Sequence, residues 1–316
     1  MQYWQPSQVR LNLRVMPCAK ALILLAILPV LPLQASESDI VQRAQRIEQL
    51  DRQLLHSTDL AHADAMRRAY QSDFDQIDDV KHLRSESDQD LKSHWNAVWR
   101  TAFYSDDSTV LDAAQRVHTE MERRGFTDAK TIAMLFNFQL KSGHFDTARE
   151  FAQKHSKVGL PAVPEFIETQ AILPSVWRFN ADGSKAERVG INLQPLQIIV
   201  AAGCHFSADA ARDIAKDPAL GPVFARHAHW LALQPGNEQL DDLAKWNREH
   251  PQTPMLPIRD RSEWALIPQW NMPTFFVVRD GKVVGSTKGW ASNDPISRKQ
   301  LVALLERTGL LEAVAH

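Results

Sequence analysis

One cysteine lies where a short apolar run meets a segment with helical spacing. The run Gln197–Ala202 is followed by Gly203 and Cys204, and His205-Phe206-Ser207 then opens the helical segment. A thiol at a helix N-terminus faces backbone N–H groups that have no partner within the helix, and their partial positive charge favours the thiolate. The pattern therefore indicates a nucleophilic cysteine between a buried strand and a helix.

The N-terminal segment has the features of an export signal. Residues 1–35 carry three basic residues and no acidic ones, and the apolar stretch 21–33 contains two prolines. That stretch is shorter than the roughly 20 residues that a membrane-spanning helix needs. We expect residues 1–35 to be a cleaved signal peptide, with a retained membrane anchor as the weaker alternative. Cleavage would leave no stable membrane span, and the expected location is the periplasm, with secretion as the other option.

Cleavage changes both the cysteine content and the charge of the chain. It removes Cys18 and three of the 36 basic residues, which leaves 33 against 38 acidic residues, a formal net charge of −5. Such a surface has no general attraction for nucleic acid. Cys204 remains as an odd thiol in a compartment where disulfides persist, which indicates reactivity or intermolecular pairing. A buried, inert cysteine is the alternative.

Residues 36–157 show apolar positions at three- and four-residue intervals, as helices do. Gly125 and Gly143 stand at expected helix ends. We predict an all-α N-terminal domain of helical hairpins. The segment 140–152 resembles the core of a tetratricopeptide-type repeat, and an irregular bundle of helical hairpins is the alternative. A proline-rich stretch of low charge, residues 158–174, is the expected linker.

Residues 175–312 change to a pattern of alternating strands and helices. Alternating apolar positions around Asp182-Gly183 predict a hairpin within residues 175–189. The elements expected after it are, in chain order, strand 197–202, helix 207–216, strand 228–233, helix 239–249, strands 274–278 and 283–287, and helix 296–308. This order predicts an α+β chain, with a C-terminal mixed sheet covered by helices on both faces.

Two segments of this second domain resemble the thioredoxin superfamily. Residues 200–207 read Val-Ala-Ala-Gly-Cys-His-Phe-Ser, which matches an active-site cysteine between the first central strand and its helix. Residues 271–285 match the family's cis-proline, strand, Asp-Gly turn and strand. The resemblance implies a thioredoxin-like domain with Cys204 as nucleophile. It also implies that Pro273 is cis and faces the cysteine, with Met272, Pro273 and Thr274 as substrate-binding residues.

Ser207 departs from the family's pattern of two cysteines separated by two residues. A serine cannot resolve a mixed disulfide, so Cys204 cannot complete a dithiol cycle alone. A mixed disulfide between Cys204 and a client would be cleaved by glutathione or another protein thiol. Alternatively, it would hold the client for longer. Ser207 is interpreted either as a hydrogen-bond donor to the thiolate or as a helix cap. His205 either stabilises the thiolate when protonated or is a solvated spacer.

Two functions remain open for this pattern. The first is thiol–disulfide exchange through Cys204 with a protein thiol or disulfide client, or with glutathione. The second is a redox-inactive thioredoxin fold that binds a partner as a scaffold or chaperone, which is favoured by Ser207 and by glycine instead of the family's frequent tryptophan before Cys204. We expect no cofactor and no metal site, because the mature chain lacks the second cysteine of common zinc sites. Metal binding by His227 and His229 stays an open alternative.

Overall fold

The computed structural model describes residues 38–292 and 294–312, so the expected signal peptide lies outside the described residues. The described residues belong to one compact unit. It comprises a helical part, residues 38–158, and a sheet-bearing part, residues 165–312. Within the described range no helix is long and apolar enough to cross a membrane.

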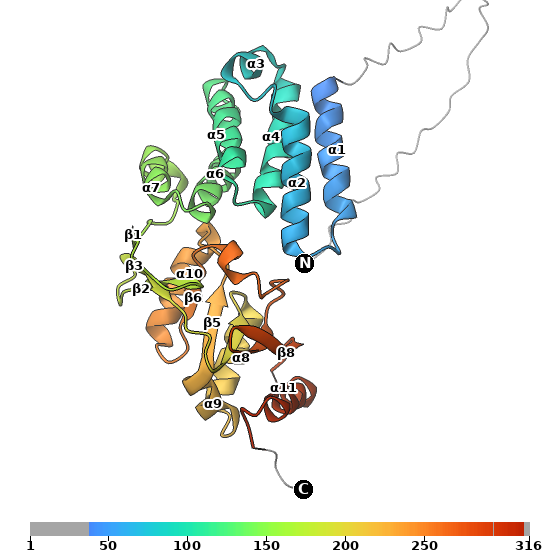
Figure 1. The fold of residues 1–316 in the computed structure, drawn as a ribbon. Coiled ribbons are helices and arrows are strands. Elements are labelled where there is room, and N and C mark those ends of the chain that lie inside the picture. The colour runs from blue at the N-terminus through green and yellow to red at the C-terminus, as the bar shows by residue number, and fades with distance from the viewer. Residues whose placement is uncertain (1–37, 293, 313–316) are drawn as a thin grey trace, which may run out of the picture. The chain divides into compact units, whose positions relative to one another are not determined.

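The helical part consists of helices α1 to α7 and a short 3-10 turn, η1 (Figure 1). Their bounds are α1 Asp39–Gln53, α2 Asp59–Phe74, α3 Val80–Ser85, α4 Asp88–Tyr104, α5 Ser108–Arg123, α6 Ala129–Lys141, α7 Phe145–Lys154 and η1 Ser156–Val158. Each helix from α1 to α6 starts after a serine, threonine or aspartate whose side chain accepts a hydrogen bond from a backbone N–H of the first turn. Such caps stabilise a helix N-terminus by about 1 kcal/mol.

Helix α4 lies at the centre of the helical part and contacts α1, α2 and α5. Its Leu91, Trp95 and Val98 are buried in one apolar cluster with residues of the neighbouring helices. Full burial of such side chains stabilises the fold by about 1.5–3 kcal/mol each. The all-α prediction for this region is therefore confirmed.

A hydrogen-bonded group of polar side chains is buried in this apolar core. His94 Nε2 lies 2.8 Å from Asp78 Oδ1, and His94 Nδ1 lies 2.9 Å from Glu86 Oε1. The hydroxyl of Tyr70 donates to the same Asp78 oxygen at 2.9 Å. Burial opposes a charged imidazole, but the hydrogen bonds to Asp78 and Glu86 outweigh it, so the pKa of His94 is raised. The group links α2 and α4 with the loop before α3 and with the C-cap residue of α3.

A small sheet of order β1-β3-β2 opens the sheet-bearing part. Strands β2 (Ser175–Phe179) and β3 (Lys185–Gly190) are antiparallel and form the predicted hairpin. Its turn contains Gly183 at a positive φ of 77°, a conformation that favours glycine. Strand β1 (Glu165–Ile167) pairs in parallel with β3 and lies within the segment expected to be a linker.

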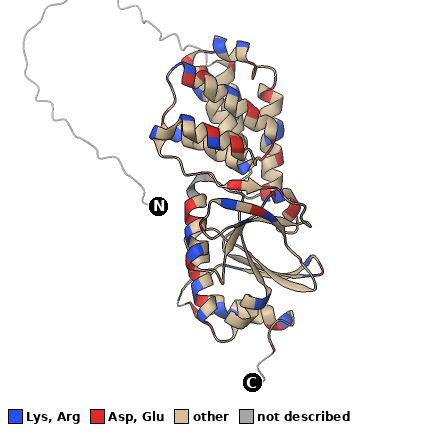
Figure 2. Cartoon of the chain, turned by 90° about the vertical axis from the view of Figure 1, so that its left-hand side faces the viewer, with Lys and Arg blue, Asp and Glu red and all other residues tan. Residues whose placement is uncertain are grey.

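The main sheet has the order β6-β5-β4-β7-β8. The bounds are β4 Leu196–Ala201, β5 Ala228–Ala232, β6 Met255–Pro257, β7 Thr274–Arg279 and β8 Lys282–Lys288. The central strand β4 is parallel to β5 and antiparallel to β7, so the sheet is mixed as predicted. Strand β6 was not predicted. Figure 2 shows few charged residues on these strands, in keeping with the burial of β4 to β7, whereas the edge strand β8 is mostly exposed.

Helices α8 to α11 supply buried residues to one face of the main sheet. Their bounds are α8 His205–Lys216, α9 Leu220–His227, α10 Asn237–Glu249 and α11 Pro295–Arg307. The opposite face packs against Val176 of the hairpin and against Trp264, Ile267 and Trp270. The prediction of helices on both faces is therefore wrong, because the hairpin and the segment that follows β6 occupy the second face. The fold class, α+β with a mixed sheet flanked by helices, is confirmed.

Candidate functional site

Cys204 lies at the boundary between β4 and α8, as the sequence predicts. It is the N-cap residue of α8, with extended backbone angles of φ −114° and ψ 169°. The preceding Gly203 has a φ of +126°. A Cβ on Gly203 would lie 3.4 Å from Met272 Sδ and 3.6 Å from Ala232 Cβ. These are ordinary van der Waals distances, so it is the positive φ of the turn out of the strand that requires glycine.

The sulfur of Cys204 lies between a hydroxyl and a backbone carbonyl. Its Sγ is 3.3 Å from Ser207 Oγ and 3.6 Å from the carbonyl oxygen of Met272. Strands β4 and β7 bring these groups together, because Ala201 is paired with Thr274 in the antiparallel register. Cys204 is a free thiol and is partly exposed. A partly exposed thiol with hydrogen-bonding neighbours can act as a nucleophile.

The residues around Pro273 take the predicted place but not every predicted role. The Met272–Pro273 peptide bond is cis, as predicted. Thr274 is only 8% exposed, and its hydroxyl donates to the carbonyl oxygen of Asn271 at 2.6 Å. The hydroxyl of Thr274 is thus engaged within its own loop. Met272 is the partly exposed member of the three and presents its carbonyl to the sulfur.

The two open interpretations of Ser207 are separated by the geometry. Ser207 is fully buried and lies three residues after the N-cap, so the interpretation of Ser207 as a helix cap is wrong. Its hydroxyl instead faces the sulfur of Cys204. His205 is exposed and its ring packs against that of Phe206, with 3.8 Å between the ring centroids. Among the described residues the hydrogen bonds of the sulfur involve Ser207 and Met272, not His205.

A pocket of about 250 Å³ opens on the other side of Cys204, between α8 and α10. We call it the thiol pocket; it is lined by Gly203, Cys204, His205, Ala208, Asp242, Leu243, Trp246 and Met255. Sequence reasoning assigned no functional role to Asp242 or Trp246. Their four-residue spacing places both on one helix face. Only the packing of α10 beside α8 shows that this face borders the cysteine.

Trp246 is held in place at the wall of the thiol pocket. Its indole N–H donates to the carbonyl oxygen of Thr253 at 2.8 Å, and the ring of His250 lies 3.9 Å from it between centroids. The guanidinium of Arg212 lies over the indole at 5.6 Å from the centroid and is ion-paired with Asp209. These contacts fix an aromatic wall beside Cys204 that a bound side chain can pack against.

The histidines considered as metal ligands lie apart from this site. His227 Nδ1 is 3.2 Å from the carbonyl oxygen of Leu196. Burial, with a smaller effect of the positive charge of Arg178, lowers the pKa of His229. Within the described part of the chain no group of three or more His, Cys, Asp or Glu side chains is arranged to hold a metal ion.

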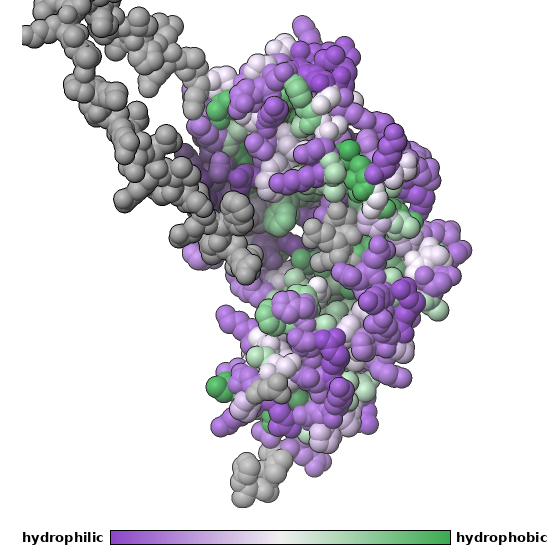
Figure 3. Space-filling view, turned by 180° about the vertical axis from the view of Figure 1, so that it is seen from behind, coloured by the Kyte–Doolittle hydropathy of each residue, from purple (hydrophilic) through white to green (hydrophobic). Residues whose placement is uncertain are grey.

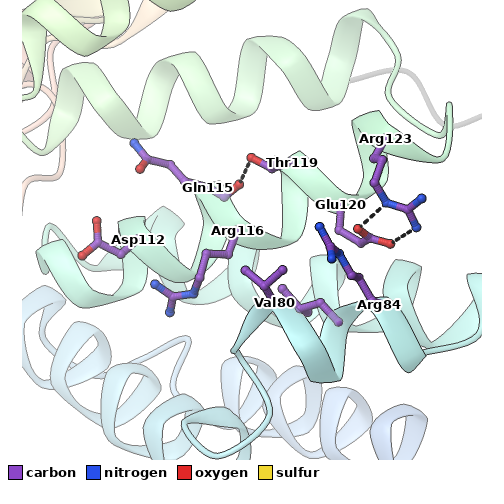
Figure 4. A pocket seen from close by; sticks show the side chains of 9 residues that line it. Val80, Arg84, Asp112, Gln115, Arg116, Thr119, Glu120 and Arg123 are labelled. Carbon is purple, nitrogen blue, oxygen red and sulfur yellow. Dashed lines mark hydrogen bonds and ion pairs between the residues drawn. The ribbon is translucent and has the colours of Figure 1, made fainter.

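A larger pocket of about 350 Å³ lies on the helical part, between α3 and α5 (Figure 4). Glu120 accepts hydrogen bonds from Arg123 and Arg124, which outweigh burial and lower its pKa to about 2. Arg116 donates to the backbone carbonyl of Asp78 at 2.9 Å. Most charges of this pocket are thus neutralised by near neighbours, which indicates a structural ion-pair network.

The loop before Pro273 is attached to the helical part of the molecule. The backbone N–H of Trp270 donates to Asp59 Oδ2 at 3.2 Å, and Asp59 also lies 3.9 Å from the guanidinium of Arg261. Nearby, the side-chain amide of Gln234 donates to Asp106 at 2.6 Å. A pocket of about 360 Å³ lies at this junction. The elements that carry the site are thus anchored to helix α2.

Comparisons with known proteins give one structural neighbour. No family model matches the sequence, and no curated protein does. A search of solved structures finds the crystal structure of a thioredoxin-like protein from Bacteroides caccae, 15% identical, with a TM-score of 0.26. The match covers 87% of this chain and 97% of that chain.

Proposed function

We propose that this protein acts in thiol–disulfide exchange through Cys204, with a protein client or with glutathione. The observation that carries the proposal is the position of the Cys204 sulfur between the hydroxyl of Ser207 and the carbonyl of Met272. The helix N-terminus adds a partial positive charge beside the sulfur. A thiolate at this position has a donor that stabilises it and an opening through which a disulfide can approach.

The exchange proceeds in two balanced steps. The Cys204 thiolate attacks one sulfur of a client disulfide, a new S–S bond forms, and the other client sulfur leaves as a thiolate with the electron pair. A second thiol, from glutathione or from a protein, then attacks the mixed disulfide and releases Cys204. Ser207 donates its hydroxyl proton in a hydrogen bond and takes no covalent part. Met272 contributes backbone groups with which an extended client can pair.

We further propose that the protein is exported and works in the periplasm after removal of residues 1–35. Disulfides form and persist in that compartment, so client disulfides are available there. N-terminal sequencing of the protein from a periplasmic extract tests this part independently of any chemistry at Cys204. A mature N-terminus near Ser36 supports it, and an intact N-terminus in the cytoplasmic fraction contradicts it.

The second candidate is a redox-inactive partner-binding protein. Two observations favour it: Ser207 replaces the resolving thiol, and Phe206 is 49% exposed beside the cysteine, where an apolar side chain can contact a partner. Figure 3 shows that the face seen there is mostly hydrophilic, with apolar residues in small groups. If a strain lacking the gene is fully complemented by the Cys204→Ala variant, this second function is the correct one.

The direct test is adduct formation by the folded mature protein. The protein is mixed with 2-hydroxyethyl disulfide under native conditions and its mass is followed with time. We expect one mixed-disulfide adduct on the wild type and none on Cys204→Ser, with release of the adduct by glutathione. An adduct that forms only after denaturation would contradict the proposal, since it would mark a buried structural cysteine.

A further inference from the structure

The thiol pocket combines one carboxylate with an apolar lining. Asp242 is its acidic residue, and Ala208, Leu243 and Met255 supply the apolar surface. Leu243 and Met255 are buried in the sheet core, 4% and 3% exposed, so the floor of the pocket is fixed. The aromatic wall is Trp246, which is partly exposed.

Asp242 lacks a cationic partner among the side chains that the structure describes. Lys245 and Arg248 follow it on α10 and border an adjoining hollow, but neither lies within ion-pairing distance of Asp242. The nearby guanidinium of Arg212 is already paired with Asp209. The thiol pocket therefore presents one unneutralised negative charge at an exposed position.

We propose that the thiol pocket seats a basic side chain of the client, next to the client's reacting sulfur. The proposal rests on the function proposed for Cys204 and specifies its substrate class. A lysine or arginine has an aliphatic stem that packs on apolar and aromatic surface while its charged head stays near solvent. The lining of the pocket matches this division, with the stem against Leu243 and Trp246 and the head at Asp242.

The charge of the pocket also discriminates between the two partner classes. Glutathione carries a net negative charge, so Asp242 repels it, whereas a peptide with lysine or arginine near its cysteine is attracted. A protein or peptide disulfide with a nearby basic residue is thus the preferred substrate for the first step. Glutathione can still carry out the second step, the attack of a thiol on the mixed disulfide, when it is present in excess.

The test uses small reagents that differ in charge. Methanethiosulfonates react with any accessible thiol: the thiolate attacks the sulfenyl sulfur, a disulfide forms, and methanesulfinate leaves with the electron pair. The second-order rate constants of the mature protein are measured with the trimethylammonium-ethyl, the sulfonatoethyl and the neutral methyl reagents. We expect the cationic reagent to react faster relative to the neutral one, and the anionic reagent slower.

The chain offers a matched control in the neighbouring aspartate. Asp241 and Asp242 are adjacent and both exposed, but only Asp242 lines the thiol pocket. Asp242→Asn should lower the cationic-to-neutral rate ratio and raise the anionic-to-neutral ratio by about fivefold each, as expected for loss of a unit charge roughly 4 Å from the charge of the reagent in water. Asp241→Asn should leave both ratios within about twofold of the wild type, because Asp241 does not line the thiol pocket. Asp242→Glu should restore most of both ratios.

Each outcome has a definite meaning. A ratio that falls equally in both variants, or that shows no charge preference in the wild type, overturns the proposed pocket. The rate with the neutral reagent should be unchanged in Asp242→Asn, which shows that the variant is folded around an accessible thiol. A third outcome separates the two proposals. If the methanethiosulfonates show the expected charge preference but the protein does not react with 2-hydroxyethyl disulfide, the proposed function is contradicted and the charge selectivity of the pocket is still supported.

Discussion

The sulfur of Cys204 and the hydroxyl oxygen of Ser207 lie 3.3 Å apart, at the N-cap and at the third residue of α8. The serine therefore occupies the place from which a second thiol would resolve a mixed disulfide. The hydroxyl of Ser207 can form a hydrogen bond with the sulfur, but it cannot form a disulfide. In the exchange proposed for Cys204, release of a mixed disulfide therefore depends on a second molecule, and single substitutions can change this dependence.

Ser207→Cys should convert the site into a dithiol. With sulfur in place of the hydroxyl, the two side chains are close enough to form a disulfide after small adjustments. We expect the oxidised variant to lose two thiols, and its mixed disulfide with 2-hydroxyethyl disulfide to disappear on its own. Mass spectrometry and thiol titration measure both. Ser207→Ala is the control and should keep a persistent mixed disulfide.

Gly203→Ala should destabilise the fold and disturb the site. The φ of +126° at Gly203 is unfavourable for alanine, although the added Cβ would make only ordinary van der Waals contacts with Met272 and Ala232. We expect a loss of about 1–3 kcal/mol in the free energy of unfolding, measured with urea. Gly289→Ala is the matched control, because Gly289 also has a positive φ, of 84°, but a Cβ there would meet no atom within 4 Å. A loss in Gly203→Ala no larger than in Gly289→Ala would show that the φ of +126° has no additional cost.

The buried His94 should make the helical part more stable below pH 6.5 than above it. Its pKa is raised in the folded protein, despite burial, by hydrogen bonds to Asp78 and Glu86. The stabilisation is fully present below the unfolded pKa of about 6.5 and is lost as pH rises through the folded pKa. Unfolding free energies measured from pH 6 to pH 9 should therefore fall, and His94→Gln should remove that part of the decrease. An identical pH profile for both proteins would contradict this assignment.

His118 should act in the opposite direction at lower pH. Burial lowers its pKa to about 4, and its Nε2 has no hydrogen-bond partner among the described residues. The folded protein therefore contains His118 in its neutral form, and the free energy of unfolding falls as pH decreases from about 6.5 towards 4. A shift of this size corresponds to roughly 3 kcal/mol below the folded pKa. His118→Phe, which keeps an aromatic ring beside Trp95, should flatten the unfolding free energy between pH 6.5 and pH 4.

Asp59→Ala should loosen the loop that leads to Pro273. The substitution removes the acceptor of the Trp270 backbone N–H and the carboxylate nearest to Arg261. We expect faster amide hydrogen exchange at residues 266–272 and a loss of about 1 kcal/mol in stability. Asp59→Asn retains an acceptor oxygen and should preserve most of the protection. Unchanged exchange in Asp59→Ala would show that the loop is held by other contacts.

The local signals of the sequence predict the site's framework well. Apolar runs, a glycine before the cysteine and the Asp-Gly turn of residues 280–281 identify β4, α8, β7 and β8, because each is encoded within a few neighbouring residues. The fold class follows from the order of these elements.

Three features could not be predicted from local sequence. Helix α9 contains Gly221 and Pro222, which resemble a break, although proline is well accommodated in a first helical turn. Strand β6 has only three residues, too few to show alternation, and ends at Pro257. The role assigned to Asp242 depends on which helix packs beside α10, a long-range contact that the pattern of a single helix does not specify.

The contact between Cys204 and Met272 spans 68 residues of the chain. During synthesis the cysteine and its helix are therefore complete well before the strand and loop that face the sulfur exist. Contacts of this separation form late, because the intervening chain must first be ordered. The nascent chain therefore carries the thiol for some time before the carbonyl of Met272 faces the sulfur.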